Sequence, residues 1–219
     1  MKMAQLLADL EPAHSTEADI LFVSRFDCKH DLEAEKKVSR KFNVFSYTSK
    51  RRGTGWPMGC NSLFFGAMEW CYHKINAGQV PHYRQILLLA GDGCPLRKDW
   101  LSFFRSENDK GVFISGALIP DEVHPHINGD TVLISSKLED LKWIALTVGD
   151  VSVTAGWDWI LSADFERRGW KNLPYVRSVW NKRSPFTSDD WKEATDAGIV
   201  WFHGQKGFSL LDMCRKMLL

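Results

Sequence analysis

The chain has 219 residues, of which 44% are hydrophobic and 25% are charged. This size and composition suit one large α/β domain with a sizeable hydrophobic core. The formal net charge of +1 excludes a global basic field, so we expect no nucleic-acid partner.

The cysteines and the N-terminal residues indicate the compartment. The five cysteines are widely spaced and form no CxxC pair, which excludes zinc-ribbon and thioredoxin motifs and suits a reduced compartment. Residues 1–22 carry early acidic side chains and no long apolar run, so they do not form a signal peptide. No stretch approaches the roughly 18 apolar residues of a membrane helix. We therefore expect a soluble, cytoplasmic protein without a transmembrane segment.

Strand-like and helix-like patterns alternate over residues 1–120. Buried strands are predicted at 19–26, 43–47, 86–89 and 111–119. Helices are predicted at 31–41, from about 59–61 onward, and within 95–104 after a turn. This alternation predicts an α/β fold with a Rossmann-related, mainly parallel sheet flanked by helices.

Residues 121–219 are less regular. Residues 124–135 resemble a loop or hairpin that enters a strand, and helices are predicted at 155–170 and 207–219. No internal repeat divides the chain. We therefore expect a single domain over residues 1–219, with one half at about 17–120 and an acceptor or lid half at about 121–219.

The loop Lys50–Asn61, KRRGTGWPMGCN, follows a predicted strand and leads into a helix. Its glycines permit close backbone approach, and the free amides of a helix N-terminus suit a phosphate or a ribose. Arg51 and Arg52 add positive charge. The glycine spacing matches neither a Walker A loop nor a GxGxxG motif. An ordinary Gly/Pro loop with a solvated basic tip explains the pattern equally well.

Asp92 stands between two glycines at the end of the apolar run ILLLA. Mg²⁺ and Mn²⁺ prefer carboxylate oxygens, and open α/β sheets bind ligands at the carboxyl ends of their strands. Asp92 is therefore a candidate metal ligand. A turn aspartate beside two glycines is an equally good interpretation.

The segment WFHGQKG, residues 201–207, combines a histidine and a lysine with two glycines. His203 can coordinate a metal ion and Lys206 can pair with a phosphate, although a lone histidine is more often structural. Elsewhere, His124 and His126 form an H-x-H pair, which is a weak metal motif because no third ligand lies nearby in the sequence.

Asp158 lies between two tryptophans in GWDW, at a predicted helix start. It suits a general base, but an N-cap is the more common role at such a position. Asp130, in INGDT, has the same ambiguity, and a turn is favoured there. The chain holds ten tryptophans, which hints at clefts that stack rings or sugars, although most of them are expected in the core.

Taken in chain order, several motifs resemble those of small GT-A-type glycosyltransferases, including enzymes encoded by large viruses and phages. The motifs are FVSRFD, GWPMGCNSLF, LLLAGDGCPLRKDW, PHINGD, GWDW and HGQKG, and they cover most of the chain. The resemblance implies a GT-A-like domain in which residues 17–120 bind the nucleotide-sugar and residues 121–219 bind the acceptor. It also implies a Mn²⁺ or Mg²⁺ cofactor on the donor diphosphate.

The resemblance assigns roles to particular residues. It implies that Asp92 and His203 hold the metal ion. It also implies a set of donor-binding residues: Ser24, Arg25, Asp27, Arg52, Gly55, Trp56, Gly59, Asn61 and Lys206. The family pattern has a second acid near the metal-binding aspartate, where this chain has only small or apolar neighbours.

The implied reaction moves a sugar from a UDP- or GDP-linked donor to a hydroxyl of a glycan or protein-glycan acceptor. Charge develops on the leaving diphosphate, where a cation, a lysine and helix amides stabilise it. The motifs do not distinguish a retaining from an inverting enzyme. For an inverting enzyme Asp158 is the preferred catalytic base, and Asp130 is the second catalytic candidate. Trp157 or Trp159 would stack on the acceptor sugar.

Two other functions compete with this interpretation. The missing second acid beside Asp92 favours a catalytically lapsed module that binds a nucleotide or glycan, while the retained Asp92, His203 and Lys206 oppose it. A nucleotidyltransferase ranks last because FVSRFD lacks the glycines expected at the end of its first strand.

Overall fold

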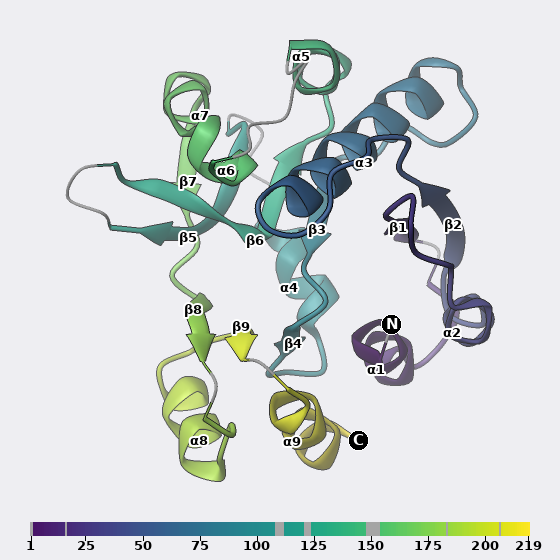
Figure 1. Ribbon diagram of the computed structural model, residues 1–219. Helices are drawn as coiled ribbons and strands as arrows, with labels where there is room; N and C mark the ends of the chain where they lie inside the picture. The colour runs from purple at the N-terminus through teal and green to yellow at the C-terminus, as the bar shows by residue number, and fades with distance from the viewer. Residues whose placement is uncertain are drawn as a thin grey trace.

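The computed structural model describes residues 2–15, 17–107, 112–120, 124–147, 154–182, 184–205 and 207–219. Within these ranges the chain forms a mixed α/β fold (Figure 1). The elements are, in chain order, α1 (Lys2–Leu10), β1 (Asp19–Ser24), α2 (Leu32–Val38), β2 (Asn43–Thr48), α3 (Met58–Asn76), β3 (Gln85–Leu89), β4 (Gly93–Pro95), α4 (Trp100–Ser106), β5 (Ile114–Ile119), β6 (His126–Ser135), α5 (Leu138–Thr147), α6 (Trp157–Ile160), α7 (Ser162–Arg168), β7 (Trp170–Asn172), β8 (Val176–Lys182), α8 (Ser188–Asp196), β9 (Trp201–Gln205) and α9 (Ser209–Leu218).

The strands of the described residues form three sheets. β1 and β2 pair in parallel, a central sheet has the order β3-β6-β5-β7, and a third sheet has the order β4-β9-β8. In the central sheet β6 is antiparallel to β3 and β5, while β7 is parallel to β5. In the third sheet β9 is antiparallel to β4 and parallel to β8.

The α/β class is confirmed, but the expected mainly parallel sheet is not, because the sheets are mixed. β6 follows β5 after residues 120–125 alone, and a parallel crossover needs about a dozen residues or more. β6 therefore returns antiparallel beside β5. The β1–β2 pair does have a helical crossover, α2, as the alternation predicted.

Local sequence signals explain several element boundaries. Asp31 caps α2 by accepting from the amide of Ala34 at 3.1 Å, and Thr187 and Asp190 form a capping box at the start of α8. α8 was not among the predicted helices, although the Thr-x-x-Asp capping pattern is present at its start. The helix expected at 155–170 is divided into α6 and α7, and the strand expected from residue 111 is described from Ile114 onward.

α3 is the central helix of the larger core. Its buried face packs against β1, the central sheet and α5, and the ring of Phe64 stacks on Trp157 with centroids 3.6 Å apart. Figure 1 shows α5, α6 and α7 at one end of the central sheet, and β4, β8 and β9 with α8 and α9 at the other end. A separate core joins α9 to β4 through Cys94, Phe202 and Leu210.

None of the helices in the described part of the chain is long and apolar enough to span a membrane.

Gly204 in β9 has a φ of +98°, and a Cβ atom there would overlap the carbonyl oxygen of Val179 in β8. We expect Gly204→Ala to lower the free energy of unfolding by about 3 kcal/mol, because left-handed backbone strain adds to the overlap. Urea denaturation measures this loss. Gly198→Ala is the matched control: its φ is +73° with nothing within 4 Å of the added Cβ, so about 1 kcal/mol is expected. Equal losses in the two variants would contradict a tight β8–β9 contact.

Candidate functional site

Three polar side chains meet where the central sheet approaches the third sheet. His203 Nε2 lies 2.6 Å from Asp92 Oδ1, and His203 Nδ1 lies 2.9 Å from Asp130 Oδ2. The histidine is buried, while the two carboxylates keep 28% and 38% of their side-chain surface exposed. Solvent and ligands can therefore reach the carboxylates that flank the ring.

Strand pairing determines this meeting. Asp92 lies in the turn between β3 and β4, and the next residue, Gly93, pairs with His203 across the third sheet. Asp130 lies in β6, and its carbonyl accepts a hydrogen bond of 2.8 Å from Ala90, the first residue after β3. Asp92 is thus a turn residue, as one of the two interpretations expected, and it is also a hydrogen-bond partner of His203. Its role as a metal ligand stays a prediction.

The environment of His203 favours its charged form. Burial by itself would lower the pKa of His203, but the hydrogen bonds and charges of Asp130 and Asp92 outweigh it and raise the pKa to about 9. Protons on both ring nitrogens let the imidazole bridge the two carboxylates. Ser178, its pairing partner in β8, adds a hydroxyl 3.3 Å from Nδ1.

The residues around Asp92 allow a test of whether a divalent cation fits. Among the described residues, no three histidine, cysteine, aspartate or glutamate side chains converge on a point suited to a metal ion. Asp92 Oδ1 and His203 Nε2 do face each other, and they form a donor pair of one carboxylate and one imidazole. Two protein ligands suit a cation such as Mg²⁺ that takes its remaining ligands from substrate phosphates and water. The pair fits a cation shared with a diphosphate better than a cation held by protein alone.

Asp158 lies next to this cluster. Its Oδ2 accepts a hydrogen bond of 2.9 Å from the amide of Gly129, the residue before Asp130, and its Oδ1 accepts one of 3.0 Å from Trp159. Burial raises the pKa of Asp158, and the charge of Asp130 adds to this, while the two amides and His126 lower it. Asp158 is not the N-cap of α6, because Gly156 holds that position. A partly buried carboxylate with a raised pKa suits proton transfer.

The two tryptophans beside Asp158 have different environments. Trp157 is buried and stacks on Phe64, so it belongs to the core. Trp159 has 49% of its surface exposed, and its ring lies 4.6 Å from the ring of His124. Of the pair, Trp159 alone presents an open ring face beside Asp158.

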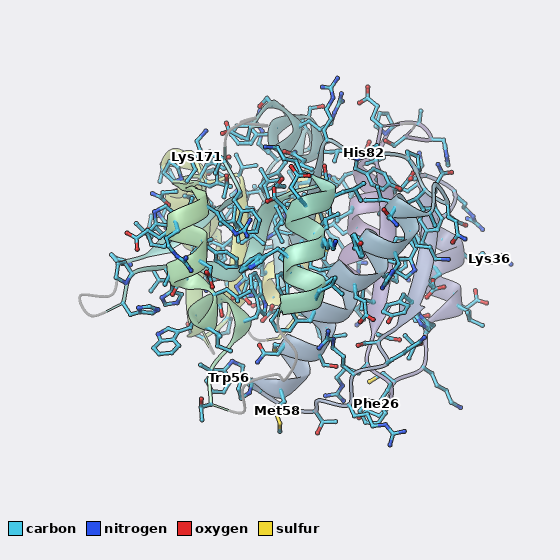
Figure 2. The ribbon with its side chains drawn as sticks, turned by 90° about the horizontal axis from the view of Figure 1, so that it is seen from above. Phe26, Lys36, Trp56, Met58, His82 and Lys171 are labelled. Atoms are coloured by element: carbon cyan, nitrogen blue, oxygen red, sulfur yellow. The ribbon has the colours of Figure 1, made fainter. Side chains whose placement is uncertain are left out.

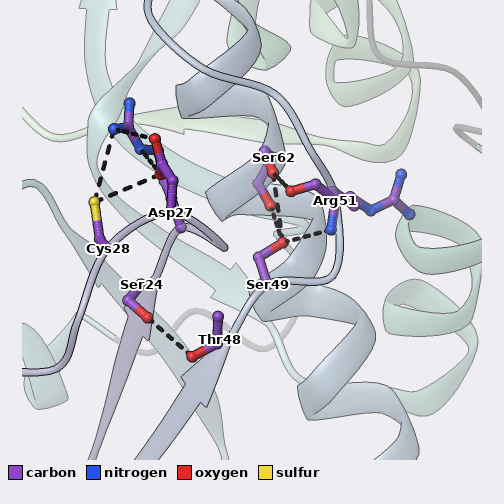
Figure 3. Close-up of polar contacts among 8 residues, drawn as sticks. Ser24, Asp27, Cys28, Thr48, Ser49, Arg51 and Ser62 are labelled. Atoms are coloured by element: carbon purple, nitrogen blue, oxygen red, sulfur yellow. Dashed lines mark hydrogen bonds and ion pairs between the residues drawn. The ribbon is translucent and has the colours of Figure 1, made fainter.

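The predicted donor-binding residues at the end of β1 also lie together (Figure 3). Arg25 donates to Asp27 Oδ2 at 3.1 Å and contacts the sulfur of Cys28 at 3.7 Å. Ser24 lies 3.2 Å from Thr48 at the end of β2. The Arg25 side chain also lies 3.6 Å from the position that a Cβ atom on Gly59 would take. The end of β1 and the 50–61 loop therefore share one edge of the fold.

Two buried serines, Ser49 and Ser62, hold that loop in place by hydrogen bonds, and neither was among the predicted site residues. Ser49 donates to the carbonyl of Ser62 at 2.9 Å, and Ser62 donates to the carbonyl of Arg51 at 2.8 Å (Figure 3). A Cβ atom on Gly66 would lie 2.5 Å from the Ser49 hydroxyl. Serines in loops are too common to reveal such contacts from sequence alone.

The tip of the loop is open to solvent. Arg52 and Gly55 are exposed, Gly55 has a φ of +67°, and Trp56 has 64% of its surface exposed. Figure 2 shows Trp56, Met58 and Phe26 at the same margin of the molecule. Two exposed aromatic side chains, Trp56 and Phe26, therefore lie beside the ends of β1 and α3.

Asn61 links the 50–61 loop to the segment that carries Asp158. It is fully buried in the first turn of α3, and its Nδ2 donates to the carbonyl of Ala155 at 3.0 Å. Ala155 immediately precedes the segment that carries Asp158. Asn61 therefore positions the loop before α6. Lys206, the remaining predicted donor-binding residue, lies outside the described residues.

A further polar network underlies the end of β1. His30 Nδ1 lies 2.8 Å from Glu35, and His30 Nε2 lies 3.0 Å from both Ser24 and Thr48. Residues 31–41 were predicted as a polar surface helix, and this contact of Glu35 with His30 was not predicted. A histidine five residues before a glutamate carries no distinctive signal.

No family model matches the chain, and no curated protein matches it in sequence. In fold, it is similar to the crystal structure of a glycosyltransferase involved in the glycosylation of the major capsid of PBCV-1. The TM-score is 0.52 at 15% sequence identity, and the match covers 92% of this chain and 100% of that chain. The resemblance to virus-type glycosyltransferases is thereby confirmed at the level of the fold.

Proposed function

We propose that this protein transfers a sugar from a UDP- or GDP-linked donor to a hydroxyl group of a glycan acceptor. The observation that carries the proposal is the meeting of Asp92, His203 and Asp130 beside Asp158, from separate segments of the chain. A carboxylate–imidazole pair beside a carboxylate of raised pKa provides the groups needed to hold a diphosphate and to accept a proton.

The proposed donor site extends from the end of β1 to β9. Arg25 and the 50–61 loop provide a cation and exposed backbone where a nucleotide would lie. Asp92 and His203 would hold Mn²⁺ or Mg²⁺, which would neutralise charge on the diphosphate when bound. Asn61 and Phe64 connect this side to the Asp158 segment, so donor and acceptor groups are positioned by one helix.

The proposed reaction is a displacement at the anomeric carbon. The acceptor oxygen forms a bond to that carbon, and the bond between the carbon and the diphosphate oxygen breaks with its electron pair leaving on the nucleotide diphosphate. Asp158 takes the proton from the acceptor hydroxyl. Each carboxylate oxygen already accepts one backbone amide and retains further lone-pair capacity for that proton.

The role of Asp158 predicts both a rate effect and a pH effect. Asp158→Asn should lower kcat/KM for transfer about 100-fold or more, because a general base contributes roughly that factor. In the wild type, transfer should fall as pH decreases through the raised pKa of Asp158, since protonation removes the base. That acid limb should lie above the usual range for an aspartate and should be absent from Asp158→Asn.

Asp164→Asn is the matched control, because Asp164 is an α7 aspartate that pairs with Arg167. It should leave both the rate and the acid limb unchanged. Binding of the donor nucleotide, followed by calorimetry, should remain within a factor of about two in either variant. Full transfer by Asp158→Asn would eliminate this residue as the base.

The two-ligand site predicts that the cation and the nucleotide bind together. Titrations with MnCl₂ alone and with UDP or GDP alone should show weak binding, and each should tighten about 10-fold or more in the presence of the other. Asp92→Asn should abolish this coupling.

A thermal-shift screen of nucleotide-sugars with Mn²⁺ would identify the donor, because a ligand that binds the folded state raises the melting temperature. If a nucleotide binds saturably but no donor is hydrolysed or transferred, the protein is a binding module and not an enzyme.

Trp159 is the proposed platform for the acceptor sugar. Trp159→Ala should raise the KM for the acceptor about 5- to 10-fold, because a stacking contact is worth about 1 kcal/mol. Hydrolysis of the donor without acceptor should stay unchanged in a steady-state assay. Leu32→Ala, which removes another exposed apolar side chain, is the control. An unaltered acceptor KM in Trp159→Ala would place the acceptor elsewhere.

A further inference from the structure

Two hydrogen bonds hold the backbone of Asp130, independently of the contact between its side chain and His203. Its amide donates to the side-chain oxygen of Asn128 at 3.0 Å, and its carbonyl accepts from Ala90 at 2.8 Å. The adjacent Gly129 amide is bound to Asp158. The carboxylate of Asp130 therefore projects from a segment that is held on both sides.

The carboxylates of Asp92 and Asp130 contact different nitrogens of the His203 ring. Asp92 faces Nε2 and Asp130 faces Nδ1, so they approach His203 from opposite edges of the imidazole. A neutral imidazole has one N–H donor and one lone pair. A histidine that binds a metal ion through one nitrogen normally donates the other N–H to a carboxylate, a carbonyl or a water.

We propose that Asp130 is a positioning residue for the metal ligand His203, rather than a catalytic base. Asp130 accepts the Nδ1–H of His203. A cation shared with Asp92 would displace the proton that Nε2 carries in the metal-free protein and would bind the Nε2 lone pair. This inference rests on the proposed function, because it takes a divalent cation at Asp92 as given. It extends that function by giving each of the three aspartates its own role: Asp92 is a metal ligand, Asp130 positions His203, and Asp158 is the base.

Two geometric observations favour this role over proton abstraction by Asp130. An oxygen of Asp130 is already hydrogen-bonded to the ring of a buried histidine, whereas Asp158 accepts hydrogen bonds from the backbone amides of Gly129 and Trp159. Ser178 also approaches Nδ1, but at 3.3 Å it is the more distant partner. Asp130 is thus the nearer of the two hydrogen-bond partners of Nδ1.

The test is Mn²⁺ affinity, measured by calorimetry on the full chain with UDP or GDP present. Asp130→Ala should weaken Mn²⁺ binding about 10- to 100-fold, the usual effect of losing such a partner. Asp130→Asn should fall between Asp130→Ala and the wild type, because an amide oxygen accepts the N–H without the negative charge. Asp158→Asn is the matched control and should leave the Mn²⁺ affinity within about 2-fold, since it does not contact His203.

A spectroscopic readout separates positioning from a general structural effect. With Mg²⁺ as the diamagnetic cation, ¹⁵N spectra of the His203 ring should show a protonated Nδ1 in the wild type and a mixture of ring states in Asp130→Ala. Equal Mn²⁺ affinity and equal ring spectra in these two proteins would overturn the positioning role alone. No Mn²⁺ or Mg²⁺ binding by the wild type with either nucleotide would overturn the inference together with the cation site of the proposed function.

Discussion

The position of His203 between Asp92 and Asp130 is the interaction on which the candidate site depends. It connects the turn after β3, the strand β6 and the strand β9, which are far apart in the sequence. A buried imidazole with a carboxylate at each nitrogen is well satisfied, because neither ring nitrogen is left without a polar partner. Gly204 allows β9 to approach β8 directly after this ring. The chemistry of the site thus relies on close packing in the small third sheet.

The first turns of α3 provide a second constraint, which relates the proposed donor site to the segment that carries Asp158. Gly59 lies against Arg25, Asn61 is bonded to Ala155, and Phe64 stacks on Trp157. A single rigid helix therefore contacts both the loop that would receive a nucleotide and the segment that carries Asp158. Rigid support of this kind suits a reaction in which two substrates must be aligned.

Most elements of the first half were predicted, because they depend on local patterns. The apolar run before Asp92 is β3, the run around Val23 is β1, and the helical spacing from Leu63 onward is α3. The parallel sheet was not predicted correctly, because strand direction depends on connection length and pairing rather than on composition. The short strands β4 and β7 have three residues each, too few for a periodic pattern to emerge.

The sequence by itself determined which chemical groups are available: an aspartate at a strand end, a late histidine between apolar residues and glycine, and an aspartate between two tryptophans. Only the tertiary structure decided how they are combined. It placed Asp130 on His203, bound Asp158 to the amide of Gly129, buried Trp157 and left Trp159 exposed. The physical reason is that side-chain identity is local, whereas strand register across β3, β6 and β9 decides which carboxylate meets which nitrogen.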